Sequence, residues 1–149
     1  MKSELRVEHR FVDRIPDVLE ERVVYVAIEF ATVVHRCCCG CGHEVVTPLS
    51  PTDWTLTFDG ETISLDPSIG NWSFQCQSHY WIRRNRVRWA PRWSKGQIAA
   101  VRAHDFVVKR GAAIEAEASD NVTRDDGYDK EKTLWGILQG LWARLTGRS

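Results

Sequence analysis

Short stretches of apolar residues, many of them β-branched, recur over the first 90 positions of the chain. Residues 4–12 alternate between apolar and charged side chains, which is typical of a strand with one buried face. Runs rich in valine and aromatic residues follow at 22–30, 31–37, 43–49, 74–76, 79–85 and 86–90. Residues 53–66 predict a hairpin that turns at Asp59 and Gly60, and the proline, glycine and asparagine at 67–72 predict a loop. The pattern indicates a small domain of antiparallel β-strands.

The apolar spacing changes after residue 93. Residues 94–111 have the period of a helix, with Ser94 as its N-cap and Gly111 at its end. Residues 112–130 contain few apolar side chains and predict a linker, whereas 131–146 regain a helical period with one broad apolar face. We therefore expect a mainly β domain of the α+β class over 1–111, a linker over 112–130 and an amphipathic C-terminal helix over 131–146, so that one or two helices follow the sheet.

The charge and the apolar content of the chain argue against nucleic acid and membranes as partners. Twenty basic and twenty acidic residues give a formal net charge of zero, so no global field attracts the protein to nucleic acid or to a membrane surface. The N-terminus has no apolar signal region and no apolar run approaches the length of a membrane span, which favours a cytoplasmic protein. Arginines and tryptophans do interleave over 83–93, a pattern found in proteins that bind single strands. With no net charge, we interpret this segment as a hairpin with arginines on its solvent-facing side and tryptophans in the core. The arginines suit either the acidic residues of the linker or an acidic protein partner.

Five cysteines supply the most distinctive chemistry in the chain. Four of them lie within residues 37–41, and the fifth, Cys76, precedes His79 by three positions. An odd number of cysteines in a reducing compartment argues against a disulfide framework. Two short clusters of potential ligands, about 35 residues apart in the sequence, are typical of a zinc site. The alternative is a set of buried reduced thiols that serve as small hydrophobic side chains.

Five side chains compete for the four positions around a Zn²⁺ ion. Four are cysteines and the fifth is His79; Cys38 is expected to point away, because neighbouring side chains of an extended segment alternate. The candidate thiols are Cys37, Cys39, Cys41 and Cys76. Four cysteine ligands would give a closed structural site and leave His79 free as a base. If His79 is a ligand, one cysteine is free as a nucleophile; a third arrangement keeps an open position for water, with Glu44 as base.

Several motifs together resemble one known family. The segments CCCGCGHEVVTPL, SLDPSIGNW and CQSHYWI are similar to those of small cysteine-rich bacterial proteins encoded in Bub-type operons for ubiquitin-like conjugation. The resemblance covers roughly residues 20–105, and the common form has proline where this chain has Cys38, which supports Cys38 not being a ligand. It implies as partners a ubiquitin-like protein and its activating-like and conjugating-like enzymes, and it implies a deubiquitinase-like peptidase role.

Peptidase chemistry requires a nucleophile, a base within hydrogen-bond reach and donors for an oxyanion. Ser68, between Pro67 and Ile69, is the candidate nucleophile and His79 the candidate base. Asp66 or Asn71 is a candidate for orienting the imidazole or for binding the oxyanion. The other interpretations are a turn residue for Ser68 and a zinc ligand for His79.

Two functional hypotheses follow from these residues and from the resemblance. The first is a zinc-stabilised peptidase or isopeptidase, deubiquitinase-like, that processes or deconjugates a bacterial ubiquitin-like protein. The second is a non-catalytic zinc-binding module that mediates an interaction in the same conjugation pathway.

Overall fold

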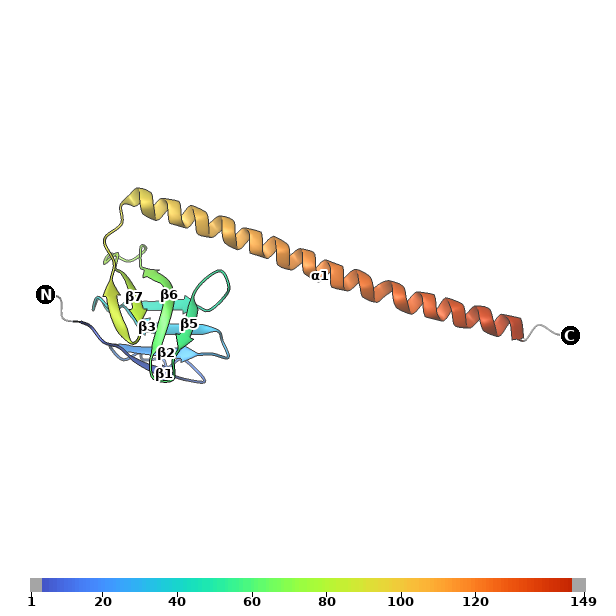
Figure 1. Cartoon of the computed structure of the whole chain (residues 1–149), viewed down its shortest axis with the longest axis horizontal. Helices are drawn as coiled ribbons and strands as arrows, with labels where there is room; N and C mark the ends of the chain where they lie inside the picture. Colours follow the sequence, from blue (N-terminus) through green and yellow to red (C-terminus); the bar gives the residue numbers. More distant parts are fainter. Residues whose placement is uncertain (1–3, 146–149) are drawn as a thin grey trace. The chain divides into compact units, whose positions relative to one another are not determined.

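The fold is described by a computed structural model, which covers residues 4–145 (Figure 1). Strands account for the regular structure up to Trp89, and one long helix follows. The elements are β1 (Glu8–Phe11), β2 (Val23–Ala27), β3 (Thr32–Arg36), β4 (Glu44–Pro48), β5 (Thr55–Phe58), β6 (Ile63–Gly70), β7 (His79–Arg83), β8 (Arg86–Trp89) and α1 (Lys95–Leu145). The prediction of a mainly β protein with helix after the sheet is confirmed.

The strands form two four-stranded sheets with the orders β1-β2-β3-β4 and β5-β6-β7-β8. All neighbouring strands are antiparallel except β1 and β2, which run parallel. Single bridges connect the sheets at both sides, between Leu49 and Trp54 and between Arg6 and Arg86. The two sheets thereby enclose a common interior.

Valine and isoleucine side chains from both sheets fill that interior. The main cluster combines residues of the first sheet, such as Val26 and Val33, with Ile63, Leu65 and Tyr80 of the second. Strand β2 is buried at every position because its other face packs against a smaller cluster around Leu19. This two-sided burial explains why the segment VVYVA is continuously apolar instead of alternating.

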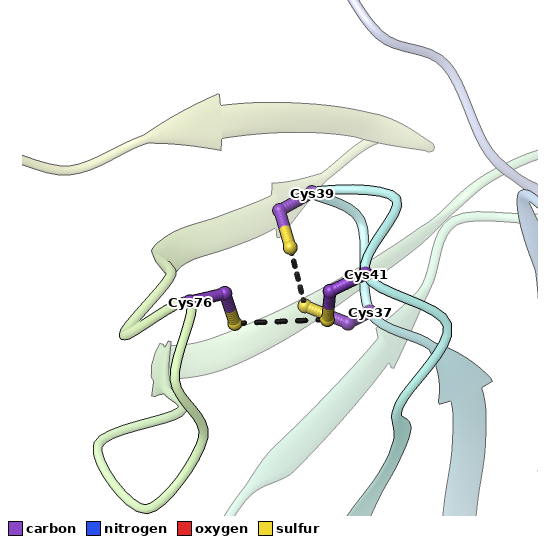
Figure 2. A group of neighbouring side chains, drawn as sticks. All are labelled: Cys37, Cys39, Cys41 and Cys76. Atoms are coloured by element: carbon purple, nitrogen blue, oxygen red, sulfur yellow. Dashed lines mark hydrogen bonds between the residues drawn. The ribbon is translucent and has the colours of Figure 1, made fainter.

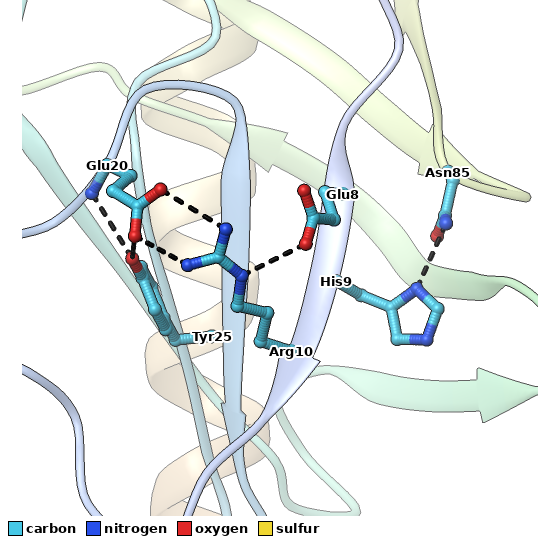
Figure 3. A network of polar contacts seen from close by, with 6 residues as sticks. All are labelled: Glu8, His9, Arg10, Glu20, Tyr25 and Asn85. Carbon is cyan, nitrogen blue, oxygen red and sulfur yellow. Dashed lines mark hydrogen bonds and ion pairs between the residues drawn. The ribbon is translucent and has the colours of Figure 1, made fainter.

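Polar contacts attach the short strand β1 at both of its sides (Figure 3). Arg10 bonds Glu8 of the same strand and Glu20 of the following loop, and the Tyr25 hydroxyl also contacts Glu20. On the other side, His9 Nδ1 accepts a hydrogen bond of 3.0 Å from the side-chain amide of Asn85. Asn85 lies in the turn between β7 and β8, so β1 links the two sheets.

Two local predictions are wrong, and both concern the chain around the candidate site. Residues 74–76 form turns and not a strand. Residues 67–70, predicted as loop, belong to β6, where Gly70 pairs with His79. The register of β6 shifts between Leu65 and Ile69. An irregularity there accommodates Pro67, which has no N–H for the ladder.

Helix α1 begins where the sequence predicted a helix. The Ser94 hydroxyl accepts a hydrogen bond from the Gln97 amide, and the Gln97 side chain accepts one from the Ser94 amide, which forms a capping box. The backbone continues as helix through 112–130, for which the sequence predicted a linker. The chain divides into two compact units, Met1–Ala103 and His104–Ser149, while the domain limits at 111 and 131 stay a prediction.

The apolar face predicted for 131–146 lies outside the part of the chain whose side chains the structure describes. Among the described residues, no helix combines the length and the apolar character that crossing a membrane requires.

Candidate functional site

Four cysteine side chains meet between two loops of the β domain (Figure 2). Their sulfur atoms all lie within 4.8 Å of one another, with Sγ–Sγ distances of 3.3 Å between Cys37 and Cys39 and 3.7 Å between Cys41 and Cys76. Zn–S bonds of about 2.3 Å in a tetrahedron place ligand sulfurs about 3.8 Å apart. The donor set therefore fits one tetrahedral metal ion of the kind that thiolates favour.

The first loop brings three of the thiols together by turning tightly. It connects β3 to β4, and Gly40 and Gly42 adopt φ values of +84° and +79°, which side chains with a Cβ rarely tolerate. The Cys37 amide bonds the His43 carbonyl at 2.8 Å and closes the loop. The sequence predicted that strand alternation puts these thiols on one side and that Gly40 and Gly42 let the backbone curl around an ion; the structure has a turn at these two glycines.

The second loop, residues 71–78, delivers Cys76 and surrounds the cluster with polar groups. The Ser78 hydroxyl lies 3.1 Å from Cys37 Sγ and 3.6 Å from Cys76 Sγ, and the Asn71 amide donates to Cys37 at 3.7 Å and to Ser78 at 2.9 Å. Asn71 and Ser78 are buried. Hydrogen bonds to ligand sulfurs orient them and tune a metal site, so Asn71 and Ser78 are placed to fix the positions of the sulfur atoms.

Protonation differs among the thiols. Burial raises the pKa of Cys39 and of Cys41 above that of an ordinary thiol. Burial also acts to raise the pKa of Cys76, but hydrogen bonds with Ser78, Cys41 and Cys39 together outweigh it and bring the pKa to about 7. Metal ions bind thiolates, so a cation that enters this cluster must displace protons, and its affinity must fall as the pH is lowered.

The remaining residues of the sequence prediction lie outside the group of four. Cys38 packs against the core, and burial raises its pKa to about 12, as expected of a structural thiol. Glu44, the candidate base for a metal-bound water, is exposed at the start of β4 and is not part of the group. His43 lies 3.2 Å from Cys41 Sγ and stacks on Phe74, while His35 is buried against the Tyr80 hydroxyl at 2.9 Å.

A second constellation joins Ser68 and His79. Ser68 lies near the end of β6 and His79 is the first residue of β7, and the Ser68 hydroxyl lies 2.9 Å from His79 Nε2. The ladder pair between Gly70 and His79 holds the two strands in this register. His79 is not in the group that could hold a metal. Its Nε2 is therefore available to accept the serine proton.

The other nitrogen of His79 faces a backbone carbonyl. Nδ1 lies 3.4 Å from the Pro91 oxygen, and this contact favours the tautomer with its proton on Nδ1 and a lone pair toward Ser68. The two candidates for this orienting role are engaged elsewhere: Asp66 bonds Arg83, and the Asn71 amide bonds Ser78. Sequence analysis could not identify Pro91, since any residue offers a carbonyl.

Three tryptophans surround the imidazole. Ring centroids of Trp72, Trp81 and Trp93 lie 4.9, 5.6 and 4.6 Å from that of His79, and Trp72 stacks on Trp93. Burial lowers the pKa of His79 below its ordinary value, although the contact with the Pro91 carbonyl acts to raise it. The imidazole is therefore neutral near pH 7, which is the form that a general base needs.

Gly70 allows Trp72 to reach this position. A Cβ added at Gly70 would lie 2.4 Å from Trp72 Nε1, which is closer than real side chains approach. We expect Gly70→Ala to displace the Trp72 ring from His79 and to lower any activity of this site by about tenfold or more. Turnover and tryptophan fluorescence measure the two effects. Gly111→Ala, which meets open space, is the control, and unchanged turnover in Gly70→Ala would contradict the role given to Trp72.

Comparison with known proteins gives one match. Neither a curated protein nor a solved structure matches the chain. The sequence model described as "Bacterial ubiquitination-like system serine protease (BubE)" matches residues 11–90. These residues contain all four clustered cysteines together with Ser68 and His79, and they make up more than half of the sequence. The chain belongs to the BubE family of serine proteases of bacterial ubiquitination-like systems.

Proposed function

We propose that this protein is a serine-type peptidase or isopeptidase, deubiquitinase-like, that cleaves bonds at the C-terminal tail of a bacterial ubiquitin-like protein. The observation that carries the proposal is the 2.9 Å contact between Ser68 Oγ and His79 Nε2, formed by a histidine outside the metal-binding group. Membership of a family described as serine proteases supports the same chemistry. The ubiquitination-like system named in that description supports the choice of substrate and partners.

The reaction follows from the positions of the two side chains. Ser68 Oγ attacks the carbonyl carbon of the scissile bond while His79 Nε2 takes the hydroxyl proton. The imidazolium gives this proton to the leaving amine, and an acyl ester on Ser68 remains. His79 then takes a proton from a water molecule that attacks the ester, and it returns this proton to Ser68 Oγ as the bond between Oγ and the acyl carbon breaks, so that the tail is released with a free carboxylate. Throughout, the Pro91 carbonyl holds the Nδ1 proton and keeps the ring in place.

We assign the four clustered cysteines, Cys37, Cys39, Cys41 and Cys76, to a structural zinc ion. Four thiolate sulfurs at these separations suit Zn²⁺, and a site with four protein ligands has no open position for substrate. Bound zinc supplies folding free energy to a small β domain. Because Cys76 and His79 are separated by two residues, a fixed cysteine loop also fixes the start of β7, where the base lies.

Incubation of the full chain with a ubiquitin-like protein extended at its C-terminus tests the proposal. We expect cleavage at a single bond after the tail, detected by intact mass, and no change in a ubiquitin-like protein that already ends at that bond. The other hypothesis, a non-catalytic interaction module, predicts a stable complex without cleavage. An intact extended substrate after prolonged incubation with zinc-loaded enzyme would therefore contradict the peptidase proposal.

The pH dependence should report the environment of His79. Since burial lowers its pKa, Nε2 loses its proton below the ordinary histidine value of about 6.5. We expect kcat/KM to fall as the pH is lowered through this pKa, with a midpoint on the acid side of 6.5 and a plateau near neutrality. A profile measured with short tail substrates tests this, and a midpoint above 7 would indicate a different base.

A further inference from the structure

A basic region lies on the outer face of the second sheet, further along β7 from Ser68 and His79, which we call the dyad. Along β7, His79, Trp81 and Arg83 alternate with Tyr80 and Ile82, which belong to the core, so these three side chains lie on the opposite face of the sheet. On that face His79 is buried against Trp72 and Trp93, and Arg83 is exposed. His79 and Arg83 are four residues apart in the strand, which corresponds to about 13 Å. The side chain of Trp81, half-buried, lies between them.

The register of β8 brings more arginines to this face. Trp81 pairs with Arg88, and Arg83 pairs with Arg86. The turn between the strands adds Arg84, and the N-terminal segment adds Arg6 through its bridge to Arg86. The five arginines line a cleft of about 790 Å³, and its other lining residues are Val7, Asp59, Glu61, Thr62, Ser64 and Asn85.

Three of the five arginines in this cleft form no ion-pair contact with a carboxylate within the described part of the chain, although Arg84 interacts electrostatically with Asp59. Arg83 bonds Asp66 and Arg86 bonds Glu4, but Arg6, Arg84 and Arg88 form no ion pair there, and all three are exposed. Asp59 is occupied by hydrogen bonds from Thr62 and from the Glu61 amide. The cleft therefore presents guanidinium groups that no carboxylate contacts directly within the described residues, and guanidinium groups bind carboxylates in a bidentate geometry.

We propose that this arginine cleft binds an acidic segment of the protein substrate, a few residues away from the bond that Ser68 attacks. This inference rests on the proposed function and adds a determinant of specificity to it. An extended peptide that lies along β6 and β7 spans the distance from the dyad to the cleft with about four residues. Carboxylates at that separation from the scissile bond would meet Arg84 and Arg88, and Trp81 would lie beneath the intervening residues.

Two features of the cleft favour an acidic peptide over a nucleic acid. Among the described residues that line it, none is aromatic, so bases find no stacking surface inside the cleft. Asp59 and Glu61 line the cleft together with the arginines, and a uniformly charged phosphate backbone would be repelled by them. A protein segment of mixed composition avoids this repulsion, because its carboxylates can contact the arginines while its neutral residues lie beside Asp59 and Glu61.

Binding can be measured without any cleavage. The probe is a fluorescein-labelled peptide of alternating glutamate and glycine. It is titrated with the full chain at low and at high salt, and binding is measured by fluorescence anisotropy. A peptide of alternating lysine and glycine and an oligothymidylate of the same length serve as comparisons. We expect the acidic peptide alone to bind, with an affinity that falls as salt increases. Arg84→Glu/Arg88→Glu should weaken it by about tenfold or more, whereas Arg14→Glu/Arg102→Glu, the same charge change at exposed positions outside the cleft, should not.

A second arm tests specificity during catalysis. Tail peptides with glutamate or lysine four residues from the scissile bond are compared, and we expect a lower KM for the glutamate peptide that disappears in Arg84→Glu/Arg88→Glu, with kcat unchanged. Equal binding of acidic and basic peptides, preferential binding of the oligothymidylate, or equal loss in the control variant would each overturn the proposal. If no tail peptide is cleaved, the peptidase proposal fails. The anisotropy titration then decides by itself whether the arginine cleft binds acidic peptides.

Discussion

Replacing Ser68 with alanine should lower kcat/KM for an extended ubiquitin-like substrate by about 10⁴-fold, and His79→Ala should do the same. Both side chains act in one proton transfer, so removing either leaves only the contribution of substrate binding and charge stabilisation. The double variant should therefore be no worse than either single variant. Rates are measured by intact mass under single-turnover conditions, which separates the chemical step from product release.

Stability provides the control for this pair. Ser68 is half-buried and its known contact is with His79, so Ser68→Ala should keep the metal content and the melting temperature of the wild-type protein. Ser73→Ala removes an equivalent hydroxyl from an exposed position of the neighbouring loop and should keep full activity. Normal cleavage by Ser68→Ala would exclude the serine mechanism, and the thiols of Cys37 and Cys41 would be the next nucleophiles to test.

Much of the β domain follows from sequence patterns that depend on few residues. Strands with alternating or β-branched runs, and the turn at Asp59 and Gly60, are specified by side chains close together in the chain. The parallel pairing of β1 with β2 was not predicted, because it depends on the distant contact of His9 with Asn85 and on the loop that contains Glu20. Short-range patterns specify elements, whereas pairing direction is decided by contacts far apart in sequence.

The candidate site shows the same division. Cysteine spacing was enough to predict a group of thiols close enough to hold a metal ion, since few other physical reasons crowd thiols together. Ser68 was assigned to a loop because proline and glycine flank it, yet the chain there is an irregular part of β6. The carbonyl that faces His79 belongs to Pro91, twelve residues away, and carries no side-chain signature. Sequence patterns indicate which reactive groups are present, but backbone partners emerge only from the fold.

The cysteine cluster should be essential for folding. We expect purified reduced protein to contain about one zinc per chain, and Cys39→Ser or Cys76→Ser to lose the metal and most of the native structure. Structural zinc sites contribute about 10–16 kcal/mol of apparent binding free energy, which is comparable to or larger than the total stability of a typical domain. A weakened site therefore shifts the balance toward the unfolded chain. Elemental analysis together with thermal unfolding monitored by circular dichroism measures both effects.

Cys38 provides the matched control for these substitutions. It neighbours Cys37 and Cys39 in the sequence but packs against the core outside the metal-binding group, so Cys38→Ala should keep one zinc per chain and lose only about 1 kcal/mol of stability from the smaller side chain.

Zinc affinity of the wild-type protein should also fall as the pH is lowered, because burial keeps the pKa values of Cys39 and Cys41 high and protons then compete with the ion. A well-folded protein without metal would contradict the assignment. The alternative of buried hydrophobic thiols would then apply to Cys37 alone among the four, since Cys39 and Cys41 are exposed and Cys76 is half-buried.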